Sequence, residues 1–281
     1  KHDGRSAILT LPVEFNKFHW QTTFYVVIAD GTPVILVRQA DINFMLYPSE
    51  DAKVKQMAFL GRAYVEFFKY IGTAADILRL NEPQIYFLPK AIDQDIEWFK
   101  KFGQGAKSVH ENTRFLLTTH TPEAAALPVY EAIGWLGPII TNMLPHHDIR
   151  DGRLDLARRL AEDSRTVVIN GVSQEHADIT KLVILQNAQE KIVGITNGSE
   201  PKLWTNSDIL SVEEQGKEVS GEVLFAAGRS AKEQLNKFLE ATNGKNFTDL
   251  NKPLVGLVRR LVAYKEQRIL FGLIEWIVGD R

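Results

Sequence analysis

Two stretches of this 281-residue sequence carry polar side chains where a strand is predicted to end. In RFLLTTHTPE, residues 114–123, strand-forming apolar side chains give way to His120. An imidazole both donates and accepts hydrogen bonds, so this histidine can contact a polar ligand or simply stabilise the chain. In KPLVGLVRRLVAYKEQ, residues 252–267, a predicted buried strand is followed at once by Arg259 and Arg260. Guanidinium groups bind phosphate oxygens in pairs, although arginines at a strand end can equally form a solvated face.

Other polar stretches can have a purely structural role instead of a role in binding or catalysis. Asn-Gly pairs follow predicted strands in RTVVINGVSQEH (165–176) and EKIVGITNGSEPKLW (190–204), and Asn-Gly is a very common turn dipeptide. Ser173, three residues before His176, can simply begin a helix. The run LPHHDIRD (144–151) contains adjacent histidines, but such pairs between helices usually form a polar loop, and we expect no metal site.

The elements that position these side chains alternate between strands and helices. We expect a hairpin in residues 24–42, then a helix from Val54 that ends at Gly72. Four short apolar strands then end in polar or glycine-bearing turns: DILRLNEPQ (76–84), RFLLTTHTPE, RTVVINGVSQEH and EKIVGITNGSEPKLW. Helices lie between them: WFKKFGQGAK (98–107), RLDLARRLAED (153–163) and EHADITKLVIL (175–185). Because ligands bind outside the carboxyl ends of parallel strands in open α/β sheets, we predict that these tips face a site.

The pattern changes after Trp204. Residues 208–243 are rich in helix-forming side chains, and Gly244 would end the last helix. The strand 254–258 and the helix EQRILFGLIEWIV (266–278) then indicate the start of a second domain. One strand and a few helices cannot complete a sheet, so we expect that second domain to be incomplete.

The composition is that of an ordinary globular protein, with 44% hydrophobic and 24% charged residues. A net charge of −2 argues against nucleic acid or an anionic membrane as the main partner. The sequence has no cysteine, which excludes disulfides and thiolate metal sites and favours a reducing compartment. It contains no apolar run long enough to span a membrane and no signal-peptide pattern, so we expect a cytoplasmic protein.

Five stretches, in this order and spacing, resemble the α-glucan phosphorylase family, which acts on glycogen, starch or maltodextrin: LNEPQ, TTHTP, INGVSQEH, ITNGS and VGLVRRLVAYK. The matching positions run from about Phe24 to Glu266. The resemblance implies an α/β fold of the GT-B glycosyltransferase type, with two facing Rossmann-like domains. Residues 1–200 would be the later part of the first domain, with sugar-facing loops, and residues 201–281 the start of the second, with a phosphate-binding Arg/Lys motif.

The resemblance implies reversible phosphorolysis of an α-1,4-glucan to glucose 1-phosphate, with pyridoxal phosphate as cofactor. By position, His120, Val172 and Asn197 would contact the glucose unit, and Tyr264 would lie against the sugar. The expected partners are an α-glucan and phosphate, and a homo-oligomer is left open.

The Arg/Lys motif would supply the remaining roles that the resemblance implies. Arg259 would bind the cofactor phosphate, while Arg260 and Lys265 would be the catalytic pair that binds the attacking phosphate. Guanidinium groups suit this work because they stay charged and grip phosphate oxygens in a bidentate manner.

Several departures from the family pattern limit what the chain is expected to do by itself. Pro83 and Gln84 stand where the family has a Gly or Thr and then a His, and Glu266 stands where a basic residue is common. The glycine-rich phosphate-facing loop and the lysine that binds pyridoxal phosphate are not in this sequence. We therefore expect a partial chain that is inactive alone.

Two alternatives to an α-glucan phosphorylase fragment stay open. One is a catalytically inactive carbohydrate-binding or interaction module that keeps the sugar-facing loops. The other is a nucleotide-sugar-dependent GT-B glucosyltransferase, in which Arg260 and Lys265 would hold a diphosphate.

Overall fold

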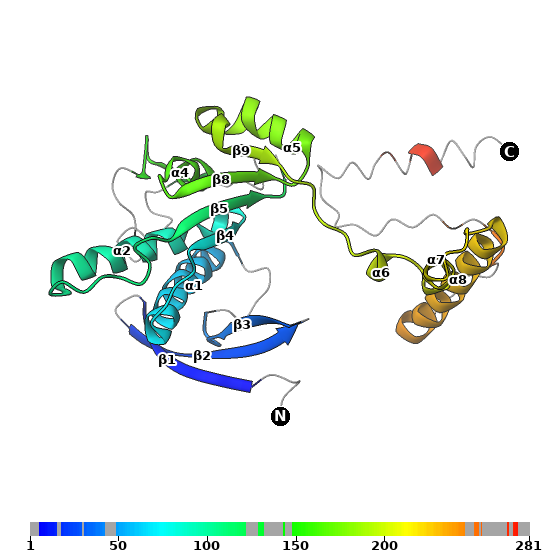
Figure 1. The fold of residues 1–281 in the computed structure, drawn as a ribbon, viewed down its shortest axis with the longest axis horizontal. Coiled ribbons are helices and arrows are strands. Elements are labelled where there is room, and N and C mark those ends of the chain that lie inside the picture. Colours follow the sequence, from blue (N-terminus) through cyan, green and yellow to red (C-terminus); the bar gives the residue numbers. More distant parts are fainter. Residues whose placement is uncertain are drawn as a thin grey trace. The chain divides into compact units, whose positions relative to one another are not determined.

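The chain divides into two compact units, residues 1–197 and residues 198–281. A computed structural model describes the following residues of the two units: 6–15, 18–29, 31–42, 49–121, 129–131, 143, 148–244, 250–252, 254, 269 and 272–274. Figure 1 shows the elements of each unit in sequence colours.

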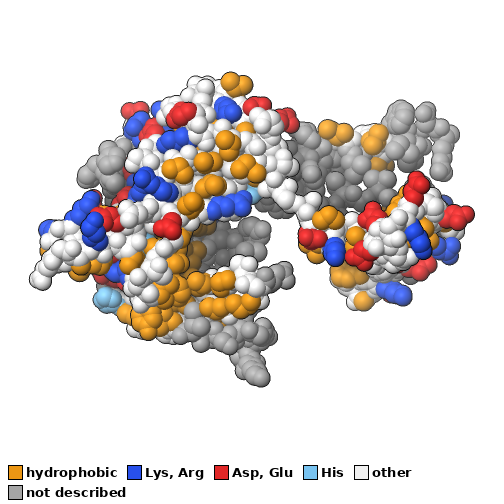
Figure 2. Space-filling model, in the orientation of Figure 1, with side chains coloured by type: hydrophobic (Ala, Val, Ile, Leu, Met, Phe, Trp, Pro, Cys, Tyr) orange, Lys and Arg blue, Asp and Glu red, His pale blue; other side chains and the backbone are white. Residues whose placement is uncertain are grey.

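The first unit begins with a three-stranded antiparallel sheet in the order β1-β2-β3. Its strands are β1 (Ser6–Phe15), β2 (Phe18–Ala29) and β3 (Thr32–Arg38). The pairing of β2 with β3, with Phe24 opposite Val37, confirms the hairpin predicted in residues 24–42. Figure 2 shows apolar side chains gathered over this region, where Phe18, Ile28 and Val34 are exposed.

Helix α1 (Glu50–Ile71) packs on this sheet through aromatic contacts and confirms the predicted helix. The ring centroids of Phe24 and Phe67 lie 5.0 Å apart. The helix ends at Gly72, whose φ of +73° is the left-handed conformation that glycine adopts without strain. Gly61 faces the next helix so closely that a Cβ there would lie 2.8 Å from the Phe87 carbonyl oxygen.

A four-stranded parallel sheet forms the centre of this unit, in the order β4-β5-β8-β9. Its strands are β4 (Ile77–Asn81), β5 (Arg114–Thr119), β8 (Thr166–Gly171) and β9 (Ile192–Gly194). Leu80, Leu117, Ile169 and Ile192 pair in one row across the sheet, and all four are buried. The four strands predicted from apolar runs are therefore confirmed, and their ends are level.

Helical crossovers connect these strands, but not all at the predicted places. They are η1 (Pro83–Tyr86), α2 (Phe87–Phe102), α4 (Leu156–Glu162), α5 (Gln174–Ile179), the π-helix η4 (Thr180–Ile184) and η5 (Gln186–Lys191). The helix predicted at 98–107 covers only the end of α2. The first residues predicted as helix at 153–163 instead form β7 (Arg153–Asp155), which pairs with β6 (Val129–Glu131).

The described part of the second unit is helical, as predicted for residues 208–243. It contains α6 (Pro201–Trp204), α7 (Ser207–Glu214) and α8 (Gly221–Asn243). Ser220 caps α8 by accepting a hydrogen bond from the Val223 amide, and Gly244 ends the helix at a φ of +69°. The predicted strand 254–258 and helix 266–278 lie almost wholly outside the described residues, so the incomplete second sheet stays a prediction. None of the helices that the structure describes is long and apolar enough to cross a bilayer.

Candidate functional site

The carboxyl ends of the four parallel strands meet at one edge of the sheet. Asn81 of β4 pairs with Thr118 of β5, and Thr118 pairs with Asn170 of β8. Gly171 of β8 pairs in turn with Gly194 of β9. We call the residues at this edge the strand-tip rim: Glu82, Thr119, His120, 170–176 and 195–197. In an open parallel sheet this is the edge where ligands bind.

His120 and Glu82 form a pair at the tips of the neighbouring strands β5 and β4. The imidazole Nδ1 lies 2.9 Å from Oε1 of Glu82. The Glu82 amide also donates a 2.8 Å hydrogen bond to the Thr118 carbonyl, which fixes this turn against β5. The two side chains are about one-third and one-quarter exposed, at 34% and 27%, so the pair is accessible from the rim.

Glu82 has an unusual backbone conformation for a residue with a side chain. Its φ is +75° and its ψ is 150°, a region that is essentially restricted to glycine. Pro83 explains the extended ψ, because the residue before a proline is driven to extended geometry, but it does not require a positive φ. Such a conformation costs on the order of 1–3 kcal/mol and tends to occur at functional sites.

A second histidine, His176, lies near His120 at the start of α5. Nε2 of His176 is 3.1 Å from the Thr119 hydroxyl, and the Ser173 hydroxyl accepts a 3.1 Å hydrogen bond from the His176 amide. The helix-start interpretation of Ser173 is therefore confirmed. Burial lowers the pKa of His176, and the nearby His120 lowers it further, so the surroundings favour the neutral ring.

Val172 and Asn197 lie next to each other where the chain leaves β8 and β9. The Asn197 amide donates to the Val172 carbonyl at 3.3 Å. Asn170 and Gly171 are the last two residues of β8 and do not form a turn, and a Cβ on Gly171 would lie 2.7 Å from the Ala177 amide nitrogen. The backbones of β8 and α5 therefore lie in close contact at Gly171.

The structure places His120, Val172 and Asn197 on one edge of the sheet, as the spacing predicts. Their contacts with a sugar stay predictions. Arg259, Arg260, Tyr264 and Lys265 lie outside the described residues, and so do their predicted contacts.

No role for Glu82, Thr119 or His176 was predicted from the sequence. For Glu82 a signal was present, since an acid directly follows a strand that precedes the histidine-bearing strand. For Thr119 and His176 no such signal was present, because their contact depends on the order of the strands in the sheet.

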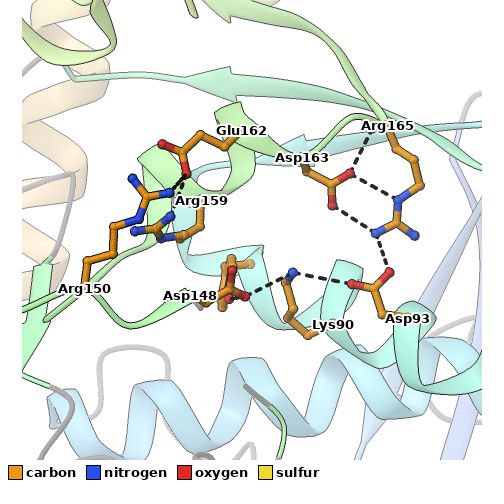
Figure 3. Close-up of polar contacts among 9 residues, drawn as sticks. Lys90, Asp93, Asp148, Arg150, Arg159, Glu162, Asp163 and Arg165 are labelled. Carbon is orange, nitrogen blue, oxygen red and sulfur yellow. Dashed lines mark hydrogen bonds and ion pairs between the residues drawn. The ribbon is translucent and has the colours of Figure 1, made fainter. Parts of the chain in front are cut away.

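A charged cavity of about 350 Å³ lies at the opposite ends of the strands. Figure 3 shows eight of the residues that line it: Lys90, Asp93, Asp148, Arg150, Arg159, Glu162, Asp163 and Arg165. Ser164 also lines the cavity. The Arg165 guanidinium lies 2.6 Å from Asp93 and 2.9 Å from Asp163, and it stacks 4.7 Å from the ring centroid of Phe115, near the start of β5. The lining holds four basic and four acidic side chains, and the ion pairs of Arg165 join α2 and the end of α4 to the residue before β8.

The two carboxylates that contact Arg165 respond differently to their surroundings. Burial raises the pKa of Asp93 and outweighs the opposing charges of Arg165 and Lys90. Burial alone would also raise the pKa of Asp163, but the hydrogen bonds and charge of Arg165 outweigh it and lower that pKa. Asp148 and Arg150 come from the predicted polar loop LPHHDIRD. His146 and His147 of that loop lie outside the described residues, and the residues that are described contain no group of metal-binding side chains.

No family model matches the sequence, and no curated protein matches it either. The fold is similar to the catalytic domain of starch synthase IV from Arabidopsis thaliana bound to ADP and acarbose, with a TM-score of 0.67 and 15% sequence identity. The match covers 99% of this chain and 57% of that chain, so the present chain spans a little over half of its length. These comparisons give no support to pyridoxal phosphate. They do confirm the predicted fold class: the α/β unit with the parallel sheet β4-β5-β8-β9 matches a GT-B glycosyltransferase domain.

Proposed function

We propose that this chain is part of a GT-B glycosyltransferase that transfers glucosyl units to or from an α-glucan. The observation that carries the proposal is the position of the partly exposed His120 with Glu82, 2.9 Å apart, at the carboxyl ends of adjacent parallel strands. Ligands bind at this edge in open α/β sheets. In this proposal His120, Val172 and Asn197 contact the sugar.

The chemistry of the strand-tip rim suits a polyhydroxyl ligand. A sugar hydroxyl both donates and accepts, and the rim offers an imidazole, an amide and backbone groups that can pair with it. Sites that pair polar groups with substrate hydroxyls discriminate strongly against analogues that lack those hydroxyls. A rim of this kind therefore favours a particular sugar unit.

A nucleotide-sugar donor is the first candidate for the reaction. The supporting observation is that the similar starch synthase domain holds ADP together with acarbose, an α-glucan analogue. The diphosphate of a nucleotide sugar would present phosphate oxygens to the protein. We propose that Arg260 and Lys265 bind them, with Arg259 beside them and Tyr264 against the sugar.

Phosphorolysis is the second candidate, favoured by the five ordered motifs of the sequence. In that reaction the same basic residues would bind inorganic phosphate as the nucleophile. The two candidates share the sugar-contacting rim and differ in what the Arg/Lys motif holds.

The test uses the complete protein that contains these 281 residues, supplied with maltodextrin. We expect incorporation of labelled glucose from ADP-glucose or UDP-glucose into the glucan. Release of glucose 1-phosphate with phosphate, and no incorporation, would replace the first candidate with the second. Glucan binding without either reaction would support the inactive carbohydrate-binding module, and absence of both binding and turnover would overturn the proposal. The isolated 281-residue chain is expected to be inactive, because both phosphate and sugar must be positioned for reaction.

A further inference from the structure

We propose that Glu82 is the positioning residue for His120, which it holds in one tautomer and one orientation for contact with a sugar hydroxyl. The inference rests on the proposed function, since it assigns a partner to the sugar-contacting histidine of that same site. Its basis is the 2.9 Å contact between Nδ1 of His120 and Oε1 of Glu82.

The contact determines which ring nitrogen of His120 is left for a ligand. A carboxylate only accepts hydrogen bonds, so Nδ1 must carry the hydrogen and donate it to Glu82. In the neutral ring Nε2 then has a free lone pair. His120 would therefore accept a hydrogen bond from a sugar hydroxyl through Nε2, with the direction of that bond fixed by Glu82.

Two features of Glu82 are costs to the fold that this role would explain. The first is the backbone at φ +75° and ψ 150°, which a glycine would adopt without strain. The second is its other carboxylate oxygen, Oε2, which is buried and has no hydrogen-bond partner among the described residues. A buried acceptor without a partner is destabilising, so Glu82 is a poor choice for stability alone.

The backbone that carries the carboxylate is also held in place. The Glu82 amide donates to the Thr118 carbonyl at 2.8 Å, one residue before Thr119 and two before His120. Pro83 follows immediately and begins η1 (Pro83–Tyr86). A carboxylate carried on a backbone that is held in this way can orient an imidazole with little loss of freedom on binding.

Three substitutions separate positioning from packing. Glu82→Gly removes the carboxylate and relieves the positive φ, Glu82→Ala removes the carboxylate and keeps the strain, and Glu82→Gln keeps an acceptor oxygen for Nδ1. We expect Glu82→Gly to melt about 2–4 °C above Glu82→Ala. Equal melting temperatures for these two variants would contradict the strain at this position.

The tautomer of His120 is read directly by ¹⁵N NMR of the ring nitrogens in the 281-residue chain, with His120→Ala used to assign the signals. In spectra recorded at about pH 9, well above the ordinary imidazole pKa of about 6.5, we expect a protonated Nδ1 and an unprotonated Nε2 in the wild type and in Glu82→Gln, and a mixture of tautomers in Glu82→Gly. An unchanged tautomer in Glu82→Gly would overturn the inference, whatever the chain binds.

Kinetics of the complete protein connect the tautomer to the sugar. We expect kcat/KM for the glucan to fall about 10- to 100-fold in Glu82→Gly, as when the carboxylate that supports a working histidine is removed, and to stay within about threefold in Glu82→Gln. A wild type with the expected tautomer but no affinity for maltotetraose would leave the positioning intact and contradict the proposed function. Normal kinetics in a folded Glu82→Gly would overturn the positioning role.

Discussion

Asn170, at the end of β8, holds the segment that follows β9. Its Oδ1 accepts a hydrogen bond of 2.9 Å from the amide of Ile195, which also donates to the Gly171 carbonyl at 3.0 Å. The Asn170 side chain is buried, and Asn197 lies two residues beyond Ile195. A buried side chain therefore helps to fix the backbone two residues before Asn197, the proposed sugar contact.

We expect Asn170→Ala to lower the free energy of unfolding by about 1–2 kcal/mol, because one of the two acceptors for the Ile195 amide is lost. Exchange of the Ile195 amide should also become faster in hydrogen-exchange measurements. Asn187→Ala is the matched control, since the Asn187 side chain bonds Glu162 on the exposed surface. If the two substitutions changed the stability and the exchange of the Ile195 amide equally, the Asn170 side chain would not stabilise this segment.

Two glycines in helices should respond in opposite ways to alanine. At Gly61 of α1, a Cβ would lie 2.8 Å from the Phe87 carbonyl oxygen and 3.0 Å from Leu88 Cα, so the backbone of α2 would have to move. We expect Gly61→Ala to destabilise the protein by about 1–3 kcal/mol. At Gly228 of α8, a Cβ would meet no atom within 4 Å. There we expect alanine to stabilise the helix by about 0.5–1 kcal/mol. Denaturant unfolding of both variants checks the contrast, and a stable Gly61→Ala would contradict the close approach of α1 and α2.

The central sheet was predictable because its strands are short apolar runs with clear ends. Leu80, Leu117, Ile169 and Ile192, which form the buried row across the sheet, each lie in such a run. The helix that ends at Gly72 was predictable for a similar reason, since its apolar residues recur every three or four positions and a glycine follows.

The sequence did not predict elements that contain a proline or are very short. Strand β1 alternates cleanly, with Val13 and Phe15 buried, but Pro12 lies within it, and a proline fits only because β1 is at the sheet edge. Helix α2 contains Pro89 in its first turn, where a missing amide costs little stability. Because a proline usually indicates the end of a helix, the start of α2 was not predicted. Strands β6 and β7 have three residues each, too few to show a period.

The candidate site was predictable in place but not in detail. Polar tips at the ends of parallel strands indicated one edge of the sheet, and His120, Val172 and Asn197 lie there. The pair of His120 with Glu82 joins residues 38 apart and depends on strand order, and no sequence pattern signals a positive φ at a glutamate.

The two carboxylates of Arg165 should give opposite dependences of stability on pH. The pKa of Asp163 is lowered in the folded protein, so its contribution to stability is present above its unfolded pKa of about 3.9 and is lost as the pH falls. The pKa of Asp93 is raised, so its contribution is present at low pH and is lost as the pH rises through the folded pKa.

Urea unfolding between pH 3 and pH 7 checks this contrast. We expect the loss of stability in Asp163→Asn, relative to the wild type, to be largest near pH 7 and to shrink as the pH falls below about 4. For Asp93→Asn the difference should move in favour of the variant as the pH rises from about 4 to 7. Parallel pH profiles for the two variants would show that the environments of Asp93 and Asp163 do not differ as described.

The last prediction separates the sugar contact from the phosphate contact in the complete protein. We expect His120→Ala to lower kcat/KM for the glucan about 10- to 1000-fold, which corresponds to about 1.4–4 kcal/mol of lost transition-state binding. The apparent affinity for phosphate or nucleotide should change little, because the histidine lies at the tip of β5 and is proposed to contact the sugar. Arg260→Ala and Lys265→Ala should instead weaken use of the phosphate-bearing substrate, each by about 1.5–3 kcal/mol.

Thermal unfolding decides whether His120 acts in recognition or in packing. Its side chain is 34% exposed, so we expect the Tm of His120→Ala to stay close to that of the wild type while glucan recognition is lost. A variant that melts early, yet whose folded fraction handles the glucan normally, would show that the histidine at the strand tip only packs against Glu82. A normal Tm together with normal glucan kinetics would remove His120 from the proposed site altogether.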